Sequence, residues 1–138
     1  MKRIRSLLLV SFLACPLLAS AQLAVTVSPV KITGQKAIVP LAFKNNLSEK
    51  IESARAAVFL LDEQGKMVGQ ATKWVIGGSA DKPGLAAGAT NSFHCVITAD
   101  KPFPTTNLMA KVTFSRVVLA NGELADIAKA VQVESAAK

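Results

Sequence analysis

The sequence predicts an all-β domain, an antiparallel sandwich of two sheets with about seven strands. Three observations point to it. Apolar and polar residues alternate over most of the chain after residue 22, as in strands that bury one face. Turn signals rich in glycine, asparagine and proline recur about every ten residues, and long runs with a helical period are missing. Short strands at this spacing are typical of immunoglobulin-like sandwiches.

The first 21 residues have the pattern of a signal peptide. Lys2, Arg3 and Arg5 precede an apolar run over residues 7–14, and small residues at 19–21 form a cleavage site. The apolar run is too short to span a bilayer. We therefore expect removal of residues 1–21, which leaves one domain, residues 22–138, in the periplasm of a bacterium or outside the cell. After cleavage the chain would not be transmembrane.

The two cysteines refine this expectation. Cys15 ends a poor lipoprotein box, with Phe12 where leucine is usual and Pro16 directly after it, so we favour simple cleavage over lipid anchoring through Cys15. Cys95 is then the single cysteine of the domain, which excludes an intramolecular disulfide. Alternation places it on one face with Phe93 and Ile97, so we expect a buried thiol.

The first two strands are expected on either side of a glycine turn. Residues 25–32 form the first, which Pro29 bends or ends, and Gly34-Gln35 turns the chain into the second, residues 37–44. Because proline has no N–H to donate, Pro40 indicates an edge position or a bulge for the second strand.

The next two strands form a predicted hairpin. Residues 51–61 and 67–76 flank Asp62-Glu63-Gln64-Gly65, a four-residue turn that Gly65 closes with a positive φ. A glycine-rich loop without an apolar anchor follows over residues 77–84 and is the best candidate for a mobile segment.

Two further strands are expected over residues 91–98 and 108–119, both with clear alternation. Between them, the prolines of residues 101–104 exclude regular structure. Asn121-Gly122 is a strong signal for a type I′ hairpin turn. It predicts that residues 123–133 return as an antiparallel strand, although their alanine-rich composition also fits a helix.

The middle of the chain resembles the FxLYD family of bacterial immunoglobulin-like modules. The matching residues are Asn45 and Asn46, Leu60-Leu61-Asp62, Gly65-Lys66-Met67-Val68, and Leu85 to Thr90 leading into Phe93. The chain departs from that pattern with Leu61 for tyrosine, Ala87 for proline, Ala89 for glutamate and an insert at residues 77–84. The resemblance covers about half of the expected mature domain and implies an extracytoplasmic, non-catalytic module.

Residues for catalysis or metal binding are scarce. His94 is the single imidazole, and its neighbour Cys95 should point to the opposite strand face, so the two do not form a nucleophile and base. A blue-copper site with Cys95 and Met109 would need two histidines. The adjacent carboxylates Asp62 and Glu63 lie in a turn. We therefore expect no enzyme, no metal and no cofactor.

Removal of the leader, with Lys2, Arg3 and Arg5, lowers the net charge from +7 to +4, and the remaining lysines are scattered singly along the chain. Such spacing argues against a nucleic-acid footprint and is compatible with weak attraction to anionic surfaces. The leading hypothesis is therefore a module that contacts an envelope protein or an anionic envelope polymer. Its contact surfaces would be loops 77–84 and 101–106 or an open sheet edge. The weak contact candidates are Trp74, Asp81, Lys82, His94, Lys101 and Phe103.

The alternative hypothesis is a carrier of a small ligand or metal in the cell envelope, which would use Trp74, His94 or Met109. Trp74 fits either a ligand platform or core filling. The identity of the ligand or partner and the oligomeric state stay open at this point.

Overall fold

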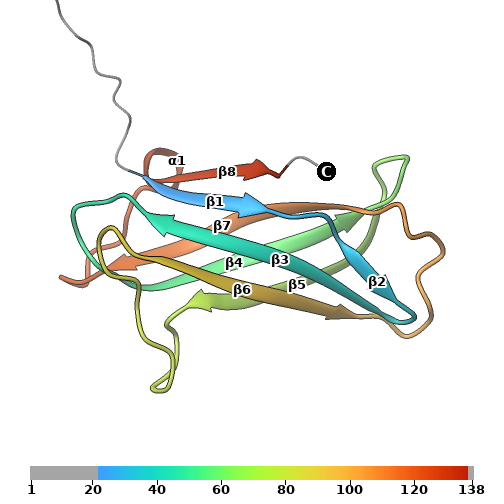
Figure 1. Ribbon diagram of the computed structural model, residues 1–138, viewed down its shortest axis with the longest axis horizontal. Helices are drawn as coiled ribbons and strands as arrows, with labels where there is room; N and C mark the ends of the chain where they lie inside the picture. Colours follow the sequence, from blue (N-terminus) through green and yellow to red (C-terminus); the bar gives the residue numbers. More distant parts are fainter. Residues whose placement is uncertain (1–21, 137–138) are drawn as a thin grey trace, which may run out of the picture.

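Two β-sheets face each other in the computed structural model, which describes residues 22–136 (Figure 1). The predicted all-β sandwich is confirmed. The strands are β1 (Leu23–Val27), β2 (Lys31–Thr33), β3 (Lys36–Asn45), β4 (Ile51–Leu61), β5 (Met67–Ile76), β6 (Thr90–Thr98), β7 (Met109–Leu119) and β8 (Val131–Ser135), with a single short helix α1 (Ile127–Ala130). The predicted signal peptide and Cys15 lie outside the described residues.

The larger sheet is organised around β3. β6 pairs with one side of β3 along residues 36–44, and β1 and β2 share its other side. β8 extends this sheet beyond β1. The smaller sheet has the order β5-β4-β7. The predicted bounds of β4 and β5 are confirmed, and the first predicted strand is divided at Pro29 into β1 and β2.

Pro40 corrects one prediction, because β3 is a central strand and not an edge. Ser28 N donates to Pro40 O at 3.0 Å, so the backbone polar groups of Pro40 face the break between β1 and β2. A backbone N–H at residue 40 would have no partner strand to bond on this side, because residues 28–30 pair with neither β3 nor another strand. Proline is therefore tolerated inside the sheet.

The end of the chain corrects two more predictions. Residues 123–133 do not form one returning strand, because only the bridge between Val118 and Leu124 continues the hairpin before α1 begins. β8 then pairs with β1 in parallel, so the sandwich is not wholly antiparallel. Asp126 caps α1 by accepting from Ala128 N at 3.2 Å, which favours a helical turn over continued pairing.

The turn at Asn121-Gly122 exists, but it is not type I′. Gly122 has a φ of +85°, whereas no described residue other than glycine has a positive φ. Gly122 N donates to Leu119 O at 2.8 Å and Leu119 N donates to Glu123 O at 2.9 Å. These bonds define a three-residue loop, a type I turn followed by a glycine bulge.

The inner faces of both sheets supply the core. Phe43 and Phe114 meet edge to face across it, with ring centroids 6.4 Å apart. Cys95 is fully buried beside Ile97, as predicted. Burial raises the pKa of its thiol, and the opposing effect of the Lys73 charge is smaller. Within residues 22–136 no helix is long and apolar enough to cross a membrane.

Candidate binding site

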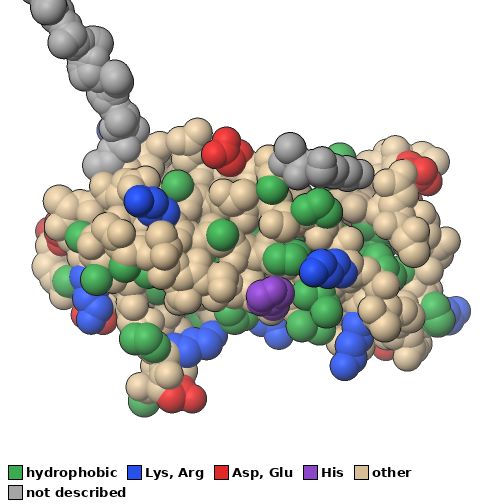
Figure 2. All heavy atoms as spheres, viewed as in Figure 1, with side chains coloured by type: hydrophobic (Ala, Val, Ile, Leu, Met, Phe, Trp, Pro, Cys, Tyr) green, Lys and Arg blue, Asp and Glu red, His purple; other side chains and the backbone are tan. Residues whose placement is uncertain are grey.

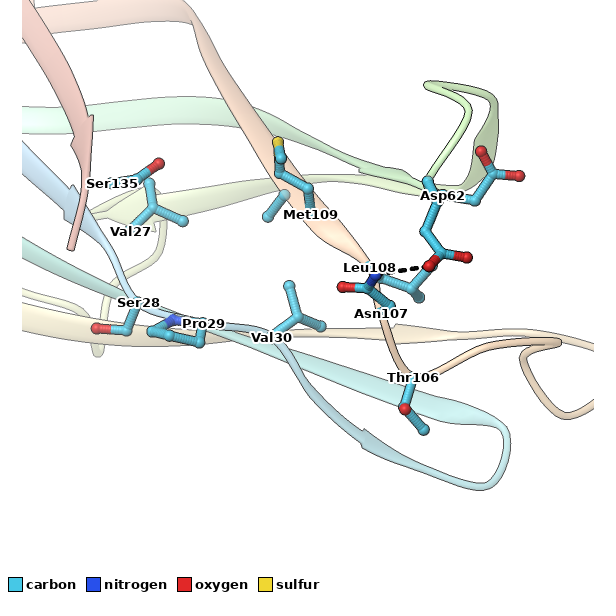
Figure 3. Close-up of a pocket in the computed structure, with 12 residues that line it drawn as sticks. Val27, Ser28, Pro29, Val30, Asp62, Thr106, Asn107, Leu108, Met109 and Ser135 are labelled. Carbon is cyan, nitrogen blue, oxygen red and sulfur yellow. Dashed lines mark hydrogen bonds between the residues drawn. The ribbon is translucent and has the colours of Figure 1, made fainter. Parts of the chain in front are cut away.

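A pocket of about 590 Å³ opens where the two sheets part, beside the ends of β1 and β8 and the start of β7 (Figure 3). Its walls come from four segments that are far apart in the sequence. The lining residues are Val27 to Val30, Asp62, Glu63, Thr106 to Ala110, and Ser135. No pattern in the sequence predicts this pocket.

The pocket exists because β8 joins the larger sheet and leaves β7 as an edge. The outer side of β7 is partly covered by the segment after its turn, where Leu119 N bonds Glu123 O and Ala125 N bonds Val117 O, each at 2.9 Å. Along residues 109–116, no strand of the described chain pairs with this side. An unpaired row of backbone donors and acceptors therefore borders the pocket.

Apolar side chains line the interior of the pocket. Val27 and Leu108 also belong to the core, and Val30 and Ala110 pack against it while partly exposed. Met109 is 66% exposed, although it lines the same pocket. Since methionine is flexible and polarizable, Met109 can adapt to an apolar group that enters.

Acidic groups form one rim of the pocket. Glu63 accepts a hydrogen bond from Asn107 Nδ2 at 2.7 Å, the contact drawn in Figure 3. Asp62 Oδ1 accepts from the backbone N–H groups of Gln64 and Lys66, both at 2.9 Å, which fixes it in the turn. Two carboxylates at one rim of a chain with a net charge of +7 favour a basic group on a ligand.

Three predicted contact residues, Trp74, Asp81 and Lys82, lie near the C-terminal end of β5 and in the loop that follows it. Lys82 Nζ donates to Trp74 O at 2.8 Å and lies 4.8 Å from the Phe93 ring centroid. Ser79 Oγ donates to Asp81 at 2.7 Å, and this bond is the main cause that lowers the pKa of Asp81. Loop 77–84 thus has polar anchors. Its predicted mobility stays a prediction.

The other predicted contact residues lie elsewhere. His94 is exposed on the outer face of the larger sheet, opposite Pro40, and is the purple side chain of Figure 2. Lys101 is exposed in the loop before β7. Phe103 is partly buried against the core, and its N–H donates to Gly34 O at 3.2 Å. A contact role for these residues stays a prediction.

The residues of the carrier hypothesis do not form one site. Trp74 lies on β5, His94 on β6 and Met109 at the start of β7. Within the part of the chain that the structure describes, no group of three or more histidine, cysteine or carboxylate side chains could hold a metal ion. Only Met109 lines the pocket.

The comparisons with known proteins concern the fold. No family model and no curated protein matches the chain. The crystal structure of an ApaA-like protein from Bordetella pertussis has a TM-score of 0.51 and 18% identity, over 77% of this chain and 88% of that chain. The X-ray structure of the structural genomics target SoR45 has a TM-score of 0.49 and 16% identity, over 72% and 77% of the two chains. At 18% identity the first likeness shows the fold alone. The FxLYD resemblance stays a prediction.

Proposed function

We propose that this protein is a non-catalytic binding module of the bacterial envelope that takes up an extended segment of a partner protein along the open edge of β7. The observation that carries the proposal is this unpaired edge, residues 109–116, whose first residues border a pocket of about 590 Å³ with both apolar and polar walls. An extended peptide that adds to a sheet edge gains affinity from main-chain hydrogen bonds and specificity from side-chain pockets. The location rests on the leader-like residues 1–21.

The pocket defines the chemistry of the segment. Its volume is within the usual range for sites that enclose an organic group, and Val27, Leu108 and Met109 would surround a large apolar side chain. The carboxylates of Asp62 and Glu63 lie on the same rim and would meet a lysine or arginine. We therefore expect a segment with alternating apolar residues and a basic residue near the one that fills the pocket.

A peptide library tests this proposal without knowledge of the partner. Displayed peptides of about eight residues, the length of a strand, are selected on residues 22–138, and amide hydrogen exchange is measured with the best binder. Residues 109–116 should become protected, whereas the outer edge of β5 should not. Protection of β5 instead, or of no strand, contradicts the proposal.

A pair of threonine substitutions supplies the control. Thr106 is exposed and lines the pocket mouth, so Thr106→Trp should fill the mouth and weaken peptide binding by about tenfold or more. Thr98→Trp adds the same ring at an exposed position of β6, away from the pocket, and should leave binding unchanged. Equal effects of both variants would contradict the pocket as the site. Uptake of a free apolar compound without protection of β7 would favour the carrier hypothesis.

A further inference from the structure

Arg55 and Arg116 form a pair on the outer face of the smaller sheet. Arg55 on β4 lies directly opposite Arg116 on β7 and opposite Trp74 on β5. Directly opposite residues of antiparallel strands project to the same face. The buried neighbours Ala54 and Val117 point into the core, so both guanidinium groups are exposed on the outside.

This arrangement is unfavourable as long as no anion is present. Like charges directly opposite each other in a sheet destabilise it. No carboxylate of residues 22–136 forms an ion pair with Arg55 or Arg116, and Glu52 is the only acidic residue in the three strands of this sheet. The register shifts between Arg55 and Ala56, where Ser115 is the extra residue of a bulge. Bulges are frequent at functional sites because they re-aim side chains.

An aromatic ring lies beside Arg55, and a third cation lies on the same strand edge as that ring. The Arg55 guanidinium carbon lies 5.9 Å from the Trp74 ring centroid, within range for a cation–π contact. Lys82 binds the backbone oxygen of Trp74 and adds positive charge at the β5 edge. Trp74 is the only tryptophan of the chain, so its fluorescence reports directly on Arg55.

We infer that Arg55 and Arg116 bind a phosphate group beside Trp74. A guanidinium presents its donors in a planar fork that matches two phosphate oxygens. Two guanidinium groups on directly opposite residues can share a ligand with more than two acceptor oxygens and more than one negative charge, which a phosphate monoester or a polyphosphate offers and a single carboxylate does not. The site lies on the outer face of the sheet, away from the pocket, although Arg116 belongs to the same strand as the unpaired edge.

Titration of Trp74 fluorescence tests the inference. Inorganic phosphate and inorganic tripolyphosphate are added to residues 22–138 at low ionic strength, and a saturable change is expected. Arg116→Gln should weaken binding by about tenfold, the effect of 1.4 kcal/mol, and Arg116→Lys should restore only part of it because the fork is lost. Lys36→Gln removes one exposed positive charge from β3 in the other sheet and should have no effect.

Two outcomes would overturn the inference. One is a titration that does not saturate below about 10 mM phosphate, because a dissociation constant above this value is too weak for a specific site. The other is equal weakening by Lys36→Gln and Arg116→Gln, which would assign the attraction to net charge. Thermal unfolding confirms that each variant is folded. Vesicles of phosphatidylcholine with and without phosphatidic acid identify the source: a response to phosphatidic acid that requires Arg116 indicates a lipid headgroup, and a response to free phosphate alone indicates a soluble ligand.

Discussion

Replacement of Asn45 by leucine should cause the largest loss of stability among single polar substitutions in this domain. Asn45 is the only buried polar residue of the described chain and is fully shielded from solvent. Its Nδ2 donates to Glu49 O and to Leu85 O, both at 2.9 Å, and its Oδ1 accepts from Leu47 N at 2.9 Å. One side chain therefore ties β3 to the loop before β4 and to the segment before β6.

The magnitude follows from what the three partners lose. A lost hydrogen bond whose partner stays dry costs about 1–3 kcal/mol, and one whose partner can reach water costs about 1 kcal/mol. The bond to Leu85 is buried, whereas those to Glu49 and Leu47 are partly buried. Asn45→Leu should therefore lower the free energy of unfolding by about 3–5 kcal/mol, a large fraction of the 5–15 kcal/mol typical of a domain.

Urea unfolding of residues 22–138, followed by Trp74 fluorescence, measures this loss. The matched control is Asn46→Leu, because Asn46 is the exposed neighbour and no side-chain hydrogen bond of it is observed. Its effect should stay within about 0.5 kcal/mol. A loss below about 1 kcal/mol for Asn45→Leu, or equal losses for both variants, would refute the reasoning that these three bonds connect the loops.

Three further predictions follow from single residues. Cys95 should resist a thiol reagent until the protein unfolds. Because burial raises its pKa in the folded state, the unfolded thiol ionises first, so the free energy of unfolding should fall as pH rises past about 8.5, and Cys95→Ala should remove that slope. Gly77→Ala should destabilise the domain far more than Gly122→Ala in urea unfolding. Both glycines have a positive φ, but a Cβ at Gly77 would clash with the backbone oxygen of Glu52, whereas one at Gly122 meets nothing within 4 Å. Protein exported from a bacterial host should begin at Gln22 by N-terminal sequencing, and a retained, lipid-modified leader would contradict the signal-peptide prediction.

Most strands could be predicted because their determinants are local. β4 and β5 have the predicted bounds, since alternation runs through both and the Asp62–Gly65 turn between them carries its own signal. Burial of Cys95 follows from the same alternation. Alternation predicts which residues of a strand face the core, but it does not predict which strand pairs with it. β8 is the example, because its partner β1 is more than a hundred residues away in the sequence.

The candidate site was missed for the same reason. In the sequence, the pocket residues Leu108, Met109 and Val27 have the pattern of ordinary strand residues. They line a pocket only because β8 pairs with β1 and not with β7. The pair of Arg55 and Arg116 likewise depends on the register of β4 with β7, including the bulge at Ser115. A local signal for the chain end was present in Asp126, which caps α1 and directs the chain away from β7.

β7 takes part in both proposals, and its length separates the pocket from the arginine pair. The pocket contacts its first residues, Met109 and Ala110, whereas Arg116 lies near its other end. Met109 and Arg116 are seven positions apart on an extended strand, a distance of about 23 Å. Sites this far apart are usually energetically independent. Thr106→Trp, which fills the pocket mouth, should therefore leave the phosphate response of Trp74 intact. Failure of one proposal would thus leave the other standing.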